Sequence, residues 1–164
     1  MDAHPVVHQF SDRLKRGEAV ERDLDAHFEE TYSIRKATMK EQRAGIDRVF
    51  TDRVTPDADE NTFNVEYKAD WRATETGNVF VETVSVDTQK VDGWAYTSQA
   101  DWLVYAFPQE RRYVLVRLAE LREKLPEWLR TFPRGKARNA TYHTHGVLVP
   151  LAEFASLAHH EGGY

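Results

Sequence analysis

The sequence predicts an α/β domain in which a central mixed β-sheet is flanked by helices. Segments whose apolar residues recur every three or four positions alternate with segments that are apolar at every second position or continuously. Their order along the chain is helix, several strands, helix, strand, helix, strand, helix. Such an order is typical of a sheet covered by helices. The length suits one domain, to which we assign residues 1–164.

The N-terminal segment predicts two helices. The first is short, around residues 7–14, and Gly17 interrupts the helical pattern after it. The second has an apolar face whose members lie four residues apart. These are Val20, Leu24 and Phe28. Glu21 borders this face, and because a charge beside a buried surface needs a partner, we expect Glu21 to have one.

Most of the middle of the chain predicts strands. Their ranges are 32–38, 45–50, 62–69 and 79–86, with further strands at 113–118 and 141–151. The alternation is cleanest at 62–69, where Phe63, Val65 and Tyr67 share one side and Glu66 and Lys68 share the other.

Three later segments predict helices. Residues 98–107 begin with Ser98 as an N-cap and end before Pro108. Residues 119–129 and 151–160 show a similar pattern, whereas the basic segment 130–138 predicts a loop.

The composition excludes several classes of protein. The absence of cysteine excludes a disulfide framework, a thiolate zinc site and a cysteine nucleophile. A mean hydropathy of -0.65 argues against a membrane protein. The first ten residues lack the basic and long apolar regions of a signal peptide, so we expect a cytoplasmic location. The net charge of -5 argues mildly against nucleic-acid binding, although acidic and basic residues are segregated along the chain.

Asp47, Glu66 and Lys68 are the residues best placed for chemistry. Asp47 falls on one predicted strand, and Glu66 and Lys68 project together from the next. Two carboxylates 4 Å apart repel by about 1 kcal/mol in water and by about 4 kcal/mol at an effective dielectric constant of 20. Mg²⁺ or Mn²⁺ would offset this repulsion, because hard cations take oxygen ligands. The alternative is an ordinary exposed ion pair on a strand, worth about 0–1 kcal/mol.

Asp47 together with Glu66-Tyr67-Lys68 resembles the motif of the PD-(D/E)XK nuclease superfamily. Residues 16–24 (RGEAVERDL) are similar to the first helix of archaeal-type Holliday junction resolvases, which carries an active-site glutamate. The resemblance covers about residues 16–118 and implies a restriction-endonuclease-like core, with residues 119–164 as a C-terminal extension. It implies metal-dependent cleavage of DNA phosphodiesters, usually by a homodimer on branched DNA.

The resemblance also implies roles for individual residues. Asp47 and Glu66 would bind the metal together with the backbone carbonyl of Tyr67, and Lys68 would serve the attacking water. The helix glutamate would be Glu21, which would join Asp47 and Glu66 at the metal, and the catalytic glutamine that opens the helix after the Glu-x-Lys strand would be Gln99.

Some features depart from the resolvase pattern. Ile46 replaces the proline before the aspartate, the strand at 79–86 is additional, and the chain extends beyond a minimal resolvase. These features also resemble phage nucleases of the same superfamily, whose location would be the host cytoplasm. The alternatives are therefore a restriction-like, repair or exonucleolytic enzyme, or a non-catalytic protein that binds nucleic acid or another protein.

Basic and aromatic residues supply candidates for contact with DNA. The basic candidates are Arg35, Lys36, Lys40, Arg43, Arg134, Lys136 and Arg138. Trp94, which follows Gly93 in a predicted loop, is the tryptophan best placed to stack on a base. Glu82 is placed where it can share a sheet face with the site, and we interpret it as structural or as a support for the site residues. We interpret His143 and His145 as polar surface residues more readily than as metal ligands.

Overall fold

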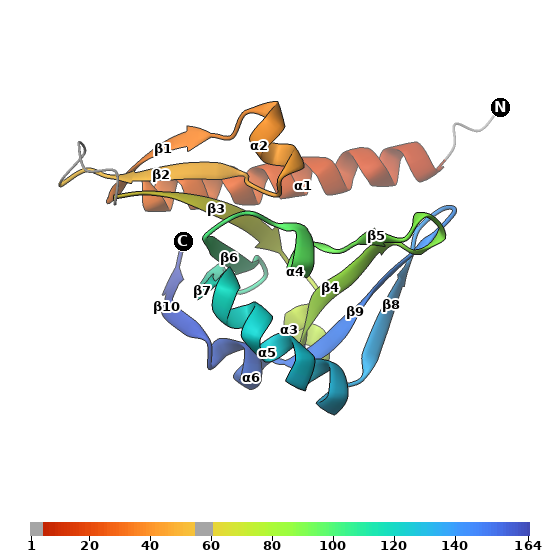
Figure 1. Ribbon diagram of the computed structural model, residues 1–164. Helices are drawn as coiled ribbons and strands as arrows, with labels where there is room; N and C mark the ends of the chain where they lie inside the picture. Colours follow the sequence, from red (N-terminus) through yellow and green to blue (C-terminus); the bar gives the residue numbers. More distant parts are fainter. Residues whose placement is uncertain (1–4, 55–60) are drawn as a thin grey trace.

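A six-stranded mixed sheet forms the centre of the protein in the computed structural model, which describes residues 5–54 and 61–164, with side chains from residue 11 onward (Figure 1). Its strands are β1 (Tyr32–Lys36), β2 (Arg48–Asp52), β3 (Thr62–Ala69), β6 (Trp102–Phe107), β7 (Arg112–Arg117) and β10 (Ala158–Gly163), in the order β1-β2-β3-β6-β7-β10. Strands β3 and β6 pair in parallel, and the other neighbouring strands pair antiparallel.

A second sheet of four strands lies beside the first. It contains β4 (Asn78–Val86), β5 (Val91–Asp92), β8 (Arg134–Arg138) and β9 (His143–Pro150), in the order β5-β4-β9-β8. Strands β4 and β5 lie in the connection between the parallel strands β3 and β6. A parallel pair needs such a crossover, and here a pair of strands takes the place of the usual long helix.

Helices cover the six-stranded sheet on its two faces. The long helix α1 (Pro5–Phe28) packs on the face that carries Phe50, Val65 and Tyr67. Helices α5 (Leu118–Thr131) and α6 (Leu151–Ala155) belong to the larger core on the other face, which also includes apolar residues of the second sheet. The remaining elements are α2 (Met39–Arg43), α3 (Ala73–Thr76), α4 (Trp94–Thr97) and the 3-10 helix η2 (Asp87–Gln89).

The α/β class and the flanked mixed sheet are confirmed. The predicted strand at 62–69 coincides with β3, and those at 32–38, 79–86, 113–118 and 141–151 correspond to β1, β4, β7 and β9 within a few residues. The predicted strand at 45–50 is displaced to β2, and the helix at 119–129 is α5. None of the helices in the described ranges is both long enough and apolar enough to cross a lipid bilayer.

Three predicted elements are wrong. Residues 98–107 do not form a helix; they lead into β6, whose residues 103–107 are all buried between β3 and β7. The predicted loop 130–138 contains β8, and the predicted helix 151–160 ends at α6 and is followed by β10. Gly17 does not interrupt a helix, because α1 continues through it for 24 residues.

Replacement of Gly17 by alanine will therefore stabilise the protein by about 0.5–1 kcal/mol, the usual difference between glycine and alanine inside a helix. A Cβ at this position would meet no heavy atom within 4 Å. Urea denaturation measures the effect. The matched control is Gly77→Ala, which also meets no atom within 4 Å but requires a φ of +74°, so this variant will lose stability. Equal effects of the two substitutions would contradict the prediction.

Candidate active site

Asp47 lies directly before β2 and is fixed against β3 by its backbone and its carboxylate. Its backbone nitrogen donates to the carbonyl of Val65 at 2.9 Å, and its carbonyl accepts from the nitrogen of Ala37 at 3.0 Å. Its Oδ2 accepts a hydrogen bond from the backbone nitrogen of Tyr67 at 2.7 Å. The carboxylate therefore lies beside the residue between Glu66 and Lys68, as predicted from adjacent strands.

Glu66 is a buried acid whose two carboxylate oxygens differ in their contacts. The residue is only 3% exposed and projects from the face of β3 opposite α1. Its Oε1 lies 2.6 Å from Lys68 Nζ. Its Oε2 is buried and has no hydrogen-bond partner in the described part of the chain. Since a buried polar atom without a partner costs about 1–3 kcal/mol, this oxygen is a candidate ligand atom.

Lys68 is surrounded by acids. Burial alone would lower the pKa of Lys68, but the carboxylates of Glu66, Asp47 and Glu82 together outweigh burial and raise the pKa above its ordinary value. Lys68 Nζ also lies 5.9 Å from the centre of the Trp94 ring. The ammonium group therefore stays protonated at neutral pH and occupies the centre of the cluster.

Glu82 is the third acid of this cluster and acts as a support for Lys68, although it lies on the second sheet and not on a face of the same sheet. Its Oε1 accepts a long hydrogen bond of 3.4 Å from the backbone nitrogen of Trp94. Burial raises the pKa of Glu82, and this effect exceeds the opposing influence of Lys68 and of the Trp94 nitrogen. Strand β4 of the second sheet thus contributes a carboxylate to the site on β3.

Glu21 does not lie with Asp47 and Glu66, where the resemblance places it. Its Oε2 pairs with Arg48 Nη2 at 2.9 Å, and Arg48 Nε contacts Asp25 at 2.9 Å. Arg48 is 5% exposed and lies on the α1 face of the sheet, whereas Glu66 and Lys68 lie on the other face. Glu21, whose side chain is 40% exposed, therefore lies at the edge of an ion-pair network that surrounds the buried Arg48 between α1 and β2. The prediction that Glu21 needs a partner is met by Arg48.

Gln99 does not open a helix, because residues 98–101 are not helical and lead into strand β6. It precedes β6, its side chain is exposed, and its backbone nitrogen donates to the carbonyl of Ala44 at 2.8 Å. The backbone bond places the 98–101 segment against the turn that leads into Asp47.

The basic residues predicted to contact DNA form two exposed groups. Arg35, Lys36, Lys40 and Arg43 lie on β1 and α2, at one edge of the six-stranded sheet. Arg134, Lys136 and Arg138 lie at alternate positions of β8, the edge strand of the second sheet, so they share a face (Figure 1). Arg35 is held by two hydrogen bonds to Glu41, each of 2.9 Å.

His143 and His145 contact the same acid, and their rings also contact each other, with centroids 6.3 Å apart. Asp87 Oδ2 lies 3.0 Å from Nε2 of His145 and 3.6 Å from Nδ1 of His143. The backbone nitrogen of His143, followed by the ring of His145, lowers the pKa of Asp87 to about 2. This cluster fixes η2 to β9.

The donor set around Glu66 fits a hard divalent cation of the kind that the resemblance implies. No group of three or more histidine, aspartate or glutamate side chains suited to a metal occurs in the described residues. Mg²⁺, however, is usually held by one or two carboxylates and several waters. Asp47 and Glu66 supply two carboxylates, and Glu66 Oε2 is an oxygen left over after Lys68 is bound.

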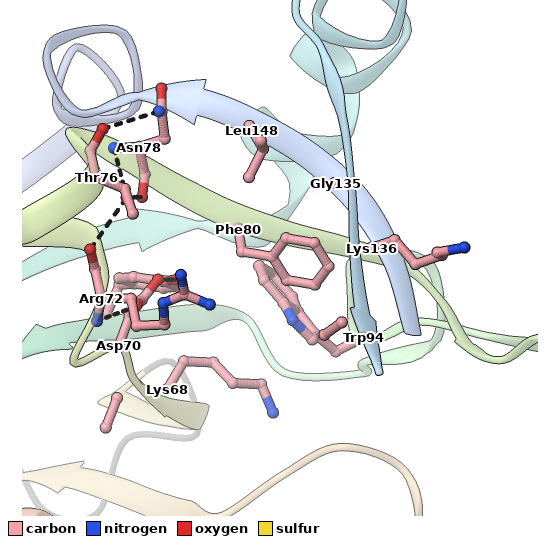
Figure 2. A pocket seen from close by; sticks show the side chains of 13 residues that line it. Lys68, Asp70, Arg72, Thr76, Asn78, Phe80, Trp94, Gly135, Lys136 and Leu148 are labelled. Carbon is pink, nitrogen blue, oxygen red and sulfur yellow. Dashed lines mark hydrogen bonds between the residues drawn. The ribbon is translucent and has the colours of Figure 1, made fainter. Parts of the chain in front are cut away.

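A cavity of about 500 Å³ adjoins this cluster (Figure 2). Lys68 belongs to the cluster and also lines the cavity. The cavity lies between β3 and the second sheet. Its walls include Phe80, Trp94 and Leu148, and Arg72 and Asp70 stand on the side of Lys68. The sequence had indicated Trp94 alone among these residues.

Comparisons of the chain with family models, curated proteins and solved structures give no match.

Proposed function

We propose that this protein is a divalent-metal-dependent endonuclease that hydrolyses DNA phosphodiesters, with a PD-(D/E)XK core. The observation that carries the proposal is the state of Glu66. This carboxylate is buried, gives one oxygen to Lys68, and keeps a second oxygen without a partner among the described residues. The carboxylate of Asp47 is fixed to the neighbouring Tyr67 nitrogen and acts on the same lysine. A cation at this point would satisfy the second oxygen and reduce the repulsion among the acids.

Asp47, Glu66 and the carbonyl of Tyr67 are the residues that would hold the cation. The N–H and C=O groups of one strand residue point to the same side in an antiparallel pair. Because the Tyr67 nitrogen points at Asp47, its carbonyl is directed to the same edge, where β2 has not yet begun. When bound, the cation would polarise the phosphodiester and lower the pKa of a coordinated water.

Lys68 would stabilise charge rather than remove a proton. The acids around it raise its pKa, so it stays an ammonium at neutral pH. A fixed cation next to the reacting phosphate stabilises the negative charge that develops during attack by water. Glu82 would help to hold Lys68 in place through the same electrostatic attraction.

Resolution of four-way junctions is the narrower form of the proposal. It rests on the similarity of residues 16–24 to the resolvase helix, and a homodimer would place two sites on a two-fold symmetric junction. The pairing of Glu21 with Arg48 weakens this similarity, because the helix glutamate is engaged on the other face of the sheet. A different DNA nuclease of the same superfamily is therefore the alternative that the geometry favours.

The test is cleavage of a panel of DNA substrates in Mg²⁺ and in Mn²⁺. The panel contains a four-way junction, a flap, a linear duplex and a single strand. We expect the wild-type protein to cut at least one of them and Asp47→Asn to lose at least about 100-fold in rate, the order expected when a charged group of the transition-state machinery is removed. Asp92→Asn, an exposed acid on β5, is the matched control and will keep full activity.

The outcomes separate the candidate functions. Preference for the junction supports a resolvase, and preference for another member of the panel supports a different nuclease. Absence of cleavage in both metals, with Asp47→Asn behaving as wild type, contradicts the proposal and favours a non-catalytic binding protein.

A further inference from the structure

The cavity beside Lys68 combines aromatic surface with positive charge. Its volume of about 500 Å³ lies within the range of pockets that hold small organic ligands. Figure 2 shows Phe80 and Trp94 together on one side, with Lys68 and Arg72 reaching toward them from the other. The Lys136 side chain points away from the cavity in the same view.

Phe80 is supported by a pair of glycines on the neighbouring strands. Gly135 of β8 and Gly146 of β9 are directly paired. A Cβ on Gly146 would lie 2.9 Å from Cζ of Phe80, and one on Gly135 would lie 3.0 Å from its Cε2. The ring therefore packs on bare backbone and is half-buried, and its remaining surface lines the cavity. This packing holds an aromatic ring in a fixed position that a planar ligand can contact.

The one acid of the described cavity lining is already fully engaged. Asp70 Oδ1 accepts from the backbone nitrogens of Arg72 and Ala73 at 2.8 and 2.9 Å. Its Oδ2 accepts from the hydroxyl of Tyr105 at 2.7 Å. The cations that face a ligand in the cavity are therefore Lys68, which is also paired with Glu66, and Arg72. Fixed aromatic surface beside two cations suits a ligand with a planar base and a phosphate.

We propose that this cavity is a subsite for one unpaired deoxynucleotide of the DNA substrate. The base of this nucleotide would stack on Phe80 and Trp94, and its phosphate would lie by Lys68 and Arg72. That the nucleotide lies next to the phosphate that is cut rests on the proposed function. A base inside a duplex must first be unstacked, which costs a few kcal/mol and least at an unpaired position. The protein therefore selects DNA with an unpaired nucleotide over a fully paired duplex.

Binding of three oligonucleotides tests the subsite. They are a duplex with a one-thymidine bulge, the same duplex with an abasic residue in the bulge, and the fully paired duplex. Binding is measured by fluorescence anisotropy in EDTA with Asp47→Asn protein, which has one acid fewer to repel phosphate and is not expected to cut. We expect the thymidine bulge to bind about tenfold more tightly than the abasic bulge, since stacking of one base on an aromatic side chain is worth about 1–3 kcal/mol.

Variants of Phe80 and Tyr96 identify the residues responsible. Phe80→Ala and the milder Phe80→Leu, each added to Asp47→Asn, will reduce the preference for thymidine over the abasic residue to less than about threefold. Phe80→Leu keeps an apolar side chain over the glycines, so it remains informative if the alanine variant fails to fold. Tyr96→Ala removes an exposed aromatic residue on α4 that does not line the cavity, and it will keep the preference.

Two results would overturn the inference. One is equal affinity for the thymidine and abasic bulges, or no binding of either. The other is a preference that survives Phe80→Leu. Because the measurement excludes divalent metal, it is independent of cleavage: a thymidine preference in a protein that cuts no DNA contradicts the proposed nuclease and retains the nucleotide subsite.

Discussion

Replacement of Arg48 by alanine will lower the free energy of unfolding by about 3–5 kcal/mol, the cost typical of breaking a buried ion pair. Arg48 is 5% exposed and contacts Asp25, Glu21 and the backbone carbonyl of Asp47. Its removal leaves Asp25, which also accepts from the hydroxyl of Tyr67, without its cation. Urea denaturation followed by circular dichroism measures the loss.

Arg35→Ala is the matched control for Arg48→Ala. Arg35 also forms a close ion pair, with Glu41 at 2.9 Å, but its side chain is 53% exposed. Exposed pairs contribute little because water competes for both charges. Similar stabilities of the two variants would show that burial between α1 and β2 does not give the Arg48 network its strength.

The same network gives a sharp test of Glu21. Glu21→Gln leaves Arg48 paired with Asp25, so we expect a smaller loss of stability than in Arg48→Ala and retention of any cleavage activity. Loss of cleavage in Glu21→Gln, with unchanged stability, would instead support the role that the resolvase resemblance implies for this residue.

Mn²⁺ or Mg²⁺ will stabilise the wild-type protein against heat, and Glu66→Gln will remove this stabilisation. A ligand present at 100 times its dissociation constant stabilises the native state by about 2.7 kcal/mol. For a chain of this size, that corresponds to an increase in Tm of about 5–10 °C. Differential scanning fluorimetry across a metal titration measures the shift without any nucleic acid.

Glu66 is expected to contribute most to metal binding, because its Oε2 is buried and, among the residues described, lacks a hydrogen-bond partner. The substitution by glutamine removes the negative charge that a cation requires while preserving the shape of the side chain. Glu123→Gln, an exposed acid on α5, is the control and will keep the full shift. An equal shift in Glu66→Gln and wild type would place the metal elsewhere.

The sequence could predict elements whose burial differs between their two faces. In β3 the alternation separates Phe63, Val65 and Tyr67, which pack toward α1, from Glu66 and Lys68. The position of Asp47 beside this strand could also be predicted, because consecutive strands of a sheet are usually neighbours. Such local patterns were sufficient to find the two carboxylates and the lysine.

Elements without such a difference could not be predicted. Strand β6 is buried from residue 103 to 107, so its apolar run has no strand period, and Trp102, Leu103 and Ala106 match a helix equally well. Strands β8 and β10 have sequences without an apolar face, RGKAR and AHHEGG, and owe their conformation to pairing with β9 and β7. Their partners, not their own residues, determine them.

The partners of charged residues were equally hidden. The need of Glu21 for a partner was visible from the helix, but Arg48 lies 27 residues away on another element. Glu82 joins the site through β4, and no local feature distinguishes it from an exposed strand residue. Only the packing of the second sheet against β3 brings it to Lys68.

The location of the second sheet has a consequence for how such a protein can diversify. Asp47, Glu66 and Lys68 are anchored in the six-stranded sheet, whereas Phe80 and Trp94 arrive on the insertion between β3 and β6. If the proposed function holds, the residues of the reaction and most of those that select the substrate lie in different stretches of the chain, and Glu82 is the site acid that the insertion contributes. Under the proposed function, exchange of residues 78–97 with Glu82 retained would give a descendant a new specificity while the proposed hydrolytic residues of the six-stranded sheet are inherited unchanged.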